Sequence, residues 1–489
     1  MDNNEIKARR SEPWREELRK TMKPKERGEI TRVTMPSLDP AYRITTIYEE
    51  VNQGLVAEQA QQEAKRCLDC ANPTCMEGCP VSINIPSFIK NIERGEFLEA
   101  AKVLKESSTL PAVCGRVCPQ ERQCESKCIY IQKMDKEPVA IGYLERFAAD
   151  YERESGQAST PEVAPANGIK VAVVGSGPAG LAFAGDMIKF GYDVTVFEAL
   201  HQIGGVLKYG IPEFRLPSSI VDFEIDTLER MGVKFVKDVI VGKTISQQDL
   251  MDQGFKGVFV ASGAGLPNFM NIPGENLNGV MSSNEFLTRV NLMDASNPES
   301  DTPVGKGKKV VVIGGGNTAM DAVRTAKRIG AEEATIVYRR SLEEMPARVE
   351  EVHHAQEEGI VFKTLHNPIE YEGDANGRVC RVLLQKMELG APDASGRRSP
   401  VAIEGATEWQ DVDEVIVSVG VSPNPLIPRA FSGIEVSKWG TIVVDQATMQ
   451  SAIPEVYAGG DIVRGGATVI LAMGDGRKAA ANMHAKLMK

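Results

Sequence analysis

The sequence predicts an α/β fold that follows a separate helical domain at the N-terminal end. Eight of the nine cysteines lie between Cys67 and Cys128, on either side of a stretch, 86–107, whose apolar residues have helical spacing. After the cysteines, short apolar runs alternate with helical stretches, which is typical of buried strands in a parallel sheet. Two of these runs, 169–174 and 309–313, end in glycines and precede helical stretches, so two Rossmann-like domains are expected.

The composition limits the classes of protein to consider. A length of 489 residues predicts about three domains. The net charge of −11 argues against a nucleic-acid partner, which requires a basic surface. Residues 1–10 lack the apolar core of a signal peptide, and no stretch approaches the roughly eighteen apolar residues of a membrane span. We therefore expect a cytoplasmic protein with no membrane-spanning segment.

The first glycine-rich loop, GSGPAG, follows the strand expected at 169–174. Gly175 permits a tight turn, Gly177 lets the backbone approach a pyrophosphate, and Gly180 lets the next helix pack closely on the strand. The N-terminal end of that helix attracts phosphate charge. Glu198 ends the next strand, 23 positions after Gly175, where a carboxylate accepts from a ribose hydroxyl. Together these features favour a dinucleotide site over a glycine-rich turn without a ligand.

Two further glycine motifs, IGG at 203–205 and AGGD at 458–461, resemble those of flavoproteins with two dinucleotide-binding domains. With the first loop, they are similar to the FAD-binding half of that family. The resemblance implies that Asp461 contacts the ribityl chain and that the helix beginning near Thr468 and Val469 faces the flavin pyrimidine edge. A positive helix end there favours the anionic reduced flavin. The FAD-site residues implied are Gly175, Gly177, Gly180, Glu198, Gly204, Gly205, Gly460, Asp461, Thr468 and Val469.

The second glycine-rich loop, GGGNTA, repeats the strand–loop–helix–strand order but lacks the acidic residue. The position equivalent to Glu198 is Val337, and Arg339 and Arg340 follow shortly after it. Arginine suits a 2′-phosphate in charge and geometry, whereas a carboxylate would repel it. The pattern favours NADPH over NADH, and the alternative is that both arginines simply end a strand in solvent. The NADPH-site residues predicted are Gly314, Gly316, Asn317, Thr318, Arg339 and Arg340.

The clustered cysteines form two sets of thiolate ligands. The first set has the spacing C-x2-C-x4-C-x3-C-P and the second C-x3-C-x5-C-x3-C. The first set resembles the bacterial ferredoxin motif with its middle gap widened by two residues. Two [4Fe–4S] clusters are the favoured interpretation; structural zinc, a disulfide framework and no metal are the alternatives. The two sets are Cys67, Cys70, Cys75 and Cys79, then Cys114, Cys118, Cys124 and Cys128.

Taken together, the cysteine region and the two nucleotide motifs resemble the small subunit of bacterial glutamate synthase over nearly the whole chain. Relatives of that family include the N-terminal part of dihydropyrimidine dehydrogenase and the NADP-binding subunits of bifurcating ferredoxin:NADP oxidoreductases. The resemblance implies one cluster on Cys67, Cys70, Cys75 and Cys128, and a second on Cys79, Cys118 and Cys124. The fourth ligand of the second cluster stays open between Glu145, which the family pattern favours, and Cys114.

The resemblance implies an α-helical iron–sulfur domain followed by FAD- and NADPH-binding domains of the glutathione-reductase type. The boundaries expected are 1–150 for the helical domain, 151–167 for a linker, 168–283 and 418–489 for the discontinuous FAD domain, and 284–417 for the NADPH domain.

The resemblance also implies the activity. Hydride would pass from NADPH to FAD, and electrons would leave through the clusters to a large, FMN-containing partner that makes glutamate from 2-oxoglutarate and glutamine. No catalytic acid or base is expected, because the cofactors carry the chemistry. One alternative is the NADP-binding subunit of a ferredoxin:NADP oxidoreductase, transhydrogenase or sulfide dehydrogenase. Another is a zinc-stabilised assembly module whose nucleotide folds bind without catalysing.

Overall fold

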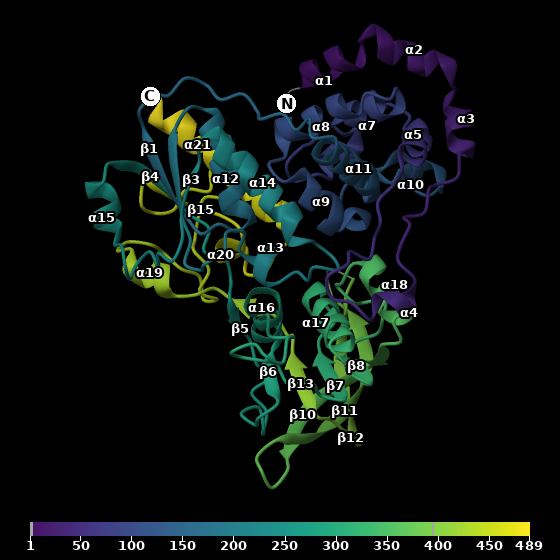
Figure 1. The fold of residues 1–489 in the computed structure, drawn as a ribbon, viewed down its shortest axis with the longest axis vertical. Coiled ribbons are helices and arrows are strands. Elements are labelled where there is room, and N and C mark those ends of the chain that lie inside the picture. Colours follow the sequence, from purple (N-terminus) through teal and green to yellow (C-terminus); the bar gives the residue numbers. More distant parts are fainter. Residues whose placement is uncertain (1–2, 394–395) are drawn as a thin grey trace.

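A computed structural model describes residues 3–393 and 396–489 and has three lobes (Figure 1). A helical domain, purple to blue in Figure 1, packs beside a sheet domain that contains the C-terminal helix. A second sheet domain projects away from both. The predicted α/β fold with a helical N-terminal domain is confirmed.

The helical domain consists of short helices broken by prolines and by the cysteine-containing turns. Four of its helices begin with proline at the first turn, where the missing N–H costs no hydrogen bond. The helices are α1 (Asn3–Arg10), α2 (Pro13–Thr21), α3 (Pro24–Glu29), α4 (Pro40–Arg43), α5 (Ala57–Arg66), α6 (Thr74–Glu77), α7 (Ile85–Glu93), α8 (Phe97–Ser107), α9 (Pro111–Val117), η1 (Gln120–Arg122), η2 (Glu125–Lys127), α10 (Ile129–Met134) and α11 (Ile141–Glu154).

The first sheet is parallel, has five strands in the order β15-β4-β1-β2-β3, and takes β15 from the C-terminal part of the chain. Helix α12, after the first strand, packs against the C-terminal helix α21. Its strands are β1 (Lys170–Val174), β2 (Asp193–Phe197), β3 (Lys234–Val236), β4 (Phe255–Val260) and β15 (Val456–Ala458). Its helices are α12 (Pro178–Lys189), α13 (Val206–Tyr209), α14 (Ser218–Met231), α15 (Gln247–Asp252), α19 (Leu426–Ala430), α20 (Asp461–Arg464) and α21 (Val469–Leu487).

The second sheet is also parallel, with five strands in the order β6-β13-β7-β8-β9. A three-stranded antiparallel sheet, which the sequence did not indicate, extends from it at the bottom of Figure 1. The strands are β6 (Val280–Ser282), β7 (Lys309–Ile313), β8 (Glu333–Tyr338), β9 (Val361–Thr364), β10 (His366–Gly373), β11 (Val379–Pro392), β12 (Arg398–Asp411) and β13 (Glu414–Val417). The helices are α16 (Ser283–Met293), α17 (Asn317–Arg328) and α18 (Val349–Glu357). The short strands β5 (Leu266–Pro267) and β14 (Val421–Ser422) pair where the chain passes between the two sheet domains.

The hydrophobic cores show how the lobes are joined. One continuous core runs through the helical domain and the first sheet domain. The second sheet domain has separate apolar cores. Its contacts with the other lobes include buried arginine–carboxylate pairs, such as Arg43 with Glu358 and Arg215 with Asp321.

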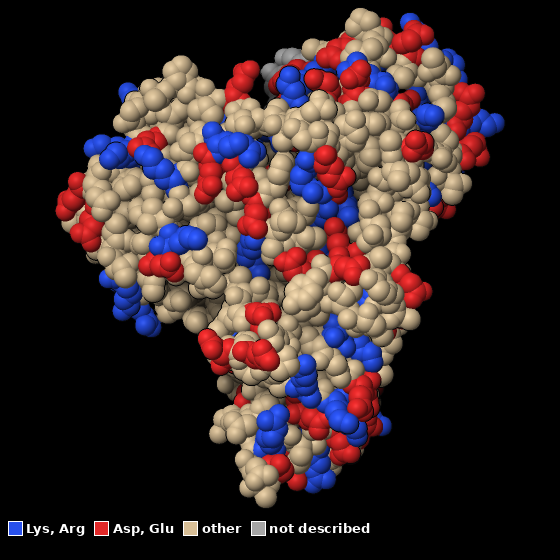
Figure 2. Space-filling view, in the orientation of Figure 1, with Lys and Arg blue, Asp and Glu red and all other residues tan. Residues whose placement is uncertain are grey.

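One face of the molecule shows how its charged side chains are distributed. On the face shown in Figure 2, basic and acidic side chains are interspersed among the described residues. Within residues 3–393 and 396–489, no helix combines the length and the apolar character needed to cross a membrane.

Candidate functional site

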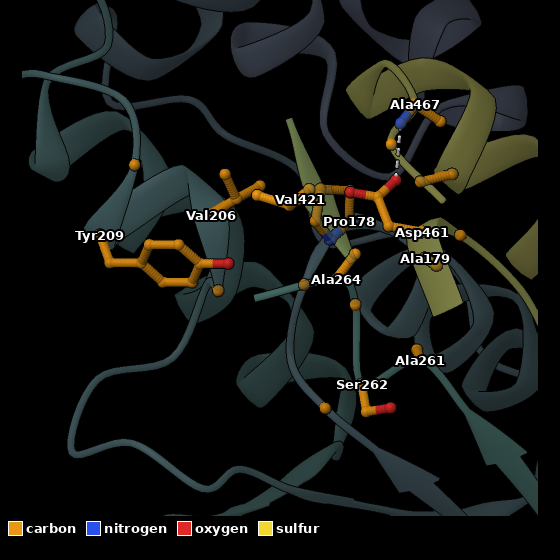
Figure 3. A pocket seen from close by; sticks show the side chains of 18 of the residues that line it. Pro178, Ala179, Val206, Tyr209, Ala261, Ser262, Ala264, Val421, Asp461 and Ala467 are labelled. Atoms are coloured by element: carbon orange, nitrogen blue, oxygen red, sulfur yellow. Dashed lines mark hydrogen bonds between the residues drawn. The ribbon is translucent and has the colours of Figure 1, made fainter. Parts of the chain in front are cut away.

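A cavity of about 790 Å³ lies between the two sheet domains and is lined by residues of both glycine-rich loops. Figure 3 shows the part of this lining that includes Pro178, Ala179 and Asp461. A volume of this size suits a cofactor-sized ligand. The predicted residues that line it are Gly175, Gly177, Glu198, Gly205, Gly460, Asp461, Thr468, Val469, Gly316, Asn317 and Thr318. The predicted residues outside its lining are Gly180, Gly204, Gly314, Arg339 and Arg340.

The β1–α12 turn brings backbone to the cavity. Gly177 caps α12, and Pro178 begins it. A Cβ at Gly180 would lie 2.1 Å from the carbonyl oxygen of Gly175, so only glycine lets this helix pack so closely on the turn. Gly180 does not line the cavity itself. It lets α12, which forms part of the cavity wall, pack closely on the turn.

Glu198, at the end of β2, supports the same turn. One carboxylate oxygen accepts from the backbone N–H of Ser176 at 2.9 Å and from its hydroxyl at 2.5 Å. The other oxygen accepts from the N–H of Leu200 at 2.9 Å. Gly204 joins this group, since its N–H donates to the Ser176 hydroxyl at 3.0 Å. The carboxylate is fixed in position at the cavity edge.

The C-terminal motif approaches the cavity from another direction. Asp461 begins α20 and accepts from the N–H of Ala467 at 3.0 Å, the dashed line in Figure 3. Burial, and then Asp475, raise the pKa of Asp461 to about 6. Thr468 caps α21 by accepting from the N–H of Leu471, so the positive end of a 19-residue helix lies at the cavity wall.

The second glycine loop reaches the same cavity from α17. Gly316 caps this helix, and the Asn317 side chain accepts from the N–H of Arg348 at 2.8 Å. Asp321, one turn further along, pairs with Arg215 of the first sheet domain at 2.8 Å, and both residues line the cavity. Gly314 lies at the end of β7, where its N–H donates to Val337. A nicotinamide and a flavin therefore have access to one space.

Arg339 and Arg340 lie beyond the end of β8 and belong to a larger group of arginines. Arg340 donates to the carbonyl of Arg398 at 2.8 Å, and Arg397 donates to the Tyr338 hydroxyl at 3.3 Å. Burial and then the neighbouring Arg340 lower the pKa of Arg339, and Arg397 adds to this effect. Such mutual repulsion between cations favours binding of an anion. Arg397 comes from the β11–β12 hairpin, and no spacing pattern in the sequence connects it with β8.

Grouped by the cluster that they are expected to hold, the first cysteine set is Cys67, Cys70, Cys75 and Cys128, and these thiols gather around one small space. All four line it, together with apolar side chains of α7 and α10. Burial raises the pKa of Cys67 to about 12. A thiolate buried here therefore requires a cationic partner, which iron provides. The residues fit a thiolate-bound cluster.

Grouped in the same way, the second cysteine set is Cys79, Cys118 and Cys124, and Glu145 of α11 lies close to it. Cys79, Cys118 and Cys124 are each close enough to Glu145 for its charge to raise their pKa values, although burial contributes more for each thiol. Burial, and then Glu224, raise the pKa of Glu145 to about 8. The Oε1 atom of Glu145 is buried without a hydrogen-bond partner. An unpaired buried carboxylate oxygen beside three thiols fits a ligand position.

Cys114, the competing ligand, is also fully buried in this region. Its thiol donates to the sulfur of Met473 on α21 at 3.5 Å and also interacts with the thiol of Cys118, so Cys114 and Glu145 both lie beside the second cysteine set. Among the described residues, no three His, Cys, Asp or Glu side chains are positioned to hold a single metal ion.

The second cysteine set is next to the cavity. Gln123, between Cys118 and Cys124, donates to the Thr468 hydroxyl at 3.4 Å. A Cβ at Gly474 of α21 would lie 3.0 Å from the carbonyl oxygen of Pro80, which follows Cys79. The helix whose N-terminus faces the cavity thus also contacts the cysteine-bearing loops.

Comparisons with known proteins define the class to which this chain belongs. Residues 43–157 match the family described as dihydropyrimidine dehydrogenase domain II, 4Fe-4S cluster. Residues 169–476 match the pyridine nucleotide-disulphide oxidoreductases. The chain therefore belongs to the pyridine nucleotide-disulphide oxidoreductase family and has a 4Fe-4S domain before its nucleotide-binding domains.

Within this class, the chain belongs to the family of glutamate synthase small chains. It is 36% identical over 457 residues to the NADPH glutamate synthase small chain of Azospirillum brasilense, covering 92% of this chain and 94% of that one. It is 37% identical over 440 residues to the Escherichia coli small chain, with 89% and 92% covered. The expected resemblance is confirmed.

Other relatives and solved structures extend the comparison. The chain is 37% identical to the beta subunit of the NADP(+)-dependent formate dehydrogenase of Moorella thermoacetica, covering 84% of this chain and 59% of that one. Mycobacterium tuberculosis FprA in complex with NADPH has a TM-score of 0.56 at 23% identity, covering 66% of this chain and 85% of that one. This last similarity supports the fold of the two sheet domains.

Proposed function

We propose that this chain is the NADPH-oxidising subunit of a glutamate synthase. It would oxidise NADPH at FAD and deliver electrons through two [4Fe–4S] clusters to a large FMN-containing subunit, which makes glutamate from 2-oxoglutarate and glutamine. The observation that carries the proposal is the single cavity lined by both glycine loops and adjoining the second cysteine set. The glutamate synthase relatives cover the chain almost from end to end, which favours this activity.

The cavity residues have separate roles in this proposal. The β1–α12 turn and Glu198 would hold the adenosine half of FAD, and Asp461 with the N-terminal end of α21 would hold the flavin half. The α17 loop would hold the NADPH pyrophosphate, and Arg339 and Arg340 its 2′-phosphate. When bound, FAD accepts a hydride and releases electrons singly, and a cluster accepts one electron.

For the clusters, the proposed ligands are Cys67, Cys70, Cys75 and Cys128 in the first and Cys79, Cys118, Cys124 and Glu145 in the second. The cavity shared by the first four thiols and the unpaired oxygen of Glu145 support this assignment.

A second candidate is the NADP-binding subunit of another redox complex. The 37% identity to the formate dehydrogenase subunit, and 38% to the NADPH-Fe(3+) oxidoreductase beta subunit of Geobacter sulfurreducens, favour it. In those proteins, this chain covers only 59% and 64% of the length, so the relatives carry additional regions.

An assay with the large subunit distinguishes the two candidates. We expect the anaerobically purified chain to reduce ferricyanide with NADPH but to form no glutamate alone. With the large glutamate synthase subunit, NADPH, glutamine and 2-oxoglutarate should yield glutamate. Failure with the large subunit, combined with electron transfer to a ferredoxin-reductase-like subunit, would favour the second candidate.

Removal of one ligand tests the first cluster. Replacing Cys67 with Ala should lower iron and acid-labile sulfide while leaving flavin reduction by NADPH largely intact, because the nucleotide cavity lies in other domains. The control is Cys380→Ala, since Cys380 lies on β11 outside both cysteine sets. Full iron content in Cys67→Ala would refute the assignment.

A further inference from the structure

Arg348 of the second sheet domain extends into the helical domain beside the second cysteine set. It immediately precedes α18, and only 5% of its surface is exposed. Its guanidinium donates to the carbonyl of Arg116 at 2.6 Å and to the side chain of Gln120 at 3.0 Å. Arg116 lies two residues before Cys118, and Gln120 two residues after it. A buried positive charge from another domain is therefore fixed against the segment that carries Cys118.

The charge of Arg348 is permanent. Burial opposes it, but Glu350 and Glu351 together raise the pKa of Arg348 above its ordinary value. The acidic groups that face the guanidinium are Glu350 at 2.8 Å and Glu121 at 3.8 Å, and the side chain of Glu350 is 18% exposed.

The position of this charge is connected to the nucleotide cavity. The N–H of Arg348 donates to Asn317, which lines the cavity at the start of α17. The Gln120 side chain that receives the guanidinium also donates to the carbonyl of Cys114 at 3.3 Å. Hydrogen bonds thus hold Arg348 from both the cavity side and the cysteine side.

We propose that Arg348 is a positioning residue that sets the reduction potential of the second iron–sulfur cluster through its buried charge. Reduction adds a negative charge to a cluster, and a nearby buried cation stabilises the reduced form because little water screens it. The inference rests on the proposed function, since it requires a cluster at Cys79, Cys118, Cys124 and Glu145. The second sheet domain would then act on an electron carrier held by the helical domain.

The test is a redox titration followed by electron paramagnetic resonance on the whole, anaerobically purified protein. In Arg348→Gln, we expect the reduced-to-oxidised ratio of one cluster at a fixed potential to fall about tenfold, which corresponds to about 59 mV for a one-electron couple. The other cluster should keep its potential. Arg348→Lys should keep most of the wild-type potential, because it retains the charge.

The matched control is Arg122→Gln. Arg122 also connects the two domains, donating to the carbonyls of Met345, Pro346 and Ala347, and it also lies between Cys118 and Cys124. It is exposed, so water screens its charge and we expect no shift. Equal potentials in wild type, Arg348→Gln and Arg122→Gln would overturn the inference.

Glu350→Gln gives an independent result if Arg348→Gln does not fold. It removes the facing negative charge, so the same cluster should become easier to reduce; no change or the opposite change would overturn the inference. Wild-type protein without acid-labile sulfide would instead refute the proposed function. Wild-type protein with clusters but without charge-dependent potentials would refute only the role of Arg348.

Discussion

Arginines at the end of β8 illustrate how single residues select a cofactor. Arg339 and Arg340 follow the strand where NADH-binding folds place a carboxylate, and Arg397 joins them from the β11–β12 hairpin. Arg340 is held by the carbonyl of Arg398, which fixes its direction. Guanidinium groups that repel one another are suited to a phosphate dianion, which neutralises their like charges.

Replacing Arg339 and Arg340 together with Ala should therefore weaken binding of 2′,5′-ADP. A charged hydrogen bond contributes about 1.5–3 kcal/mol, which predicts a loss of roughly tenfold to a hundredfold per arginine. Affinity for 5′-AMP, which lacks the 2′-phosphate, should not change. Isothermal titration calorimetry gives both values.

The matched control is Arg381→Ala, which removes an arginine of β11 that pairs with Glu372. If the double variant binds 2′,5′-ADP as tightly as Arg381→Ala does, the two arginines that follow β8 do not bind the phosphate.

Between elements, the contact of α9 with α11 decides whether the second cysteine set can form. A Cβ at Gly115 would lie 2.6 Å from the Cα atom of Arg146, so the two helices meet there backbone to backbone. The close contact between the two helices brings Glu145, which precedes Arg146 on α11, near Cys118, which follows the last residue of α9. The proposed ligand geometry therefore requires a residue without a side chain at position 115.

Gly115→Ala should separate the two helices and remove about half of the iron, with the remainder bound by the first cysteine set. Overpacking of this kind costs about 1–3 kcal/mol, so the fold should survive. Iron and sulfide analysis combined with electron paramagnetic resonance checks this result.

Gly28→Ala is the control, because a Cβ there meets side chains only at an ordinary 3.6 Å. Full occupancy of both clusters in Gly115→Ala would show that the helices tolerate the added methyl group.

At the scale of the whole molecule, buried charges help to hold the second sheet domain against the other lobes. Glu358 pairs with Arg43 of the helical domain and with Arg324 and Arg328 of α17. Figure 1 shows α4, which carries Arg43, beside α18. Glu351 pairs with Arg324 in the same group. The N-terminal segment is thereby tied to the domain that carries the NADPH loop.

Glu358→Gln should destabilise the protein by about 3–5 kcal/mol, because it removes a buried carboxylate that three guanidinium groups share and leaves the buried Arg328 without an ion-pair partner. Guanidinium unfolding followed by tryptophan fluorescence measures the change. The control is Glu357→Gln, which removes a carboxylate that also contacts Arg43 but has a side chain 52% exposed. If Glu358→Gln and Glu357→Gln were equally stable, burial of the carboxylate would not determine its contribution to stability.

The same group of charges predicts that the free energy of unfolding depends on pH. Burial by itself would raise the pKa of Glu351, but Arg324 and Arg215 lower it to about 2 from an ordinary value of 4.5. A lowered folded-state pKa means that this stabilisation is fully present above about pH 4.5 and is lost as the pH falls towards 2. A free energy of unfolding that stayed constant as the pH fell from about 4.5 towards 2 would contradict the lowered pKa of Glu351.

The sequence by itself determined the features that depend on neighbouring residues. Two strand–glycine–helix units, the missing acidic residue after the second unit and the cysteine spacing follow from local backbone geometry and ligand chemistry, and they predicted the fold and the class of protein. Only the tertiary structure placed Arg397 beside Tyr338, Arg348 beside the Cys118 segment and Arg43 against Glu358. These partners are 59, 232 and 315 positions apart. No periodic pattern links residues so distant, because their contact depends on how whole domains pack.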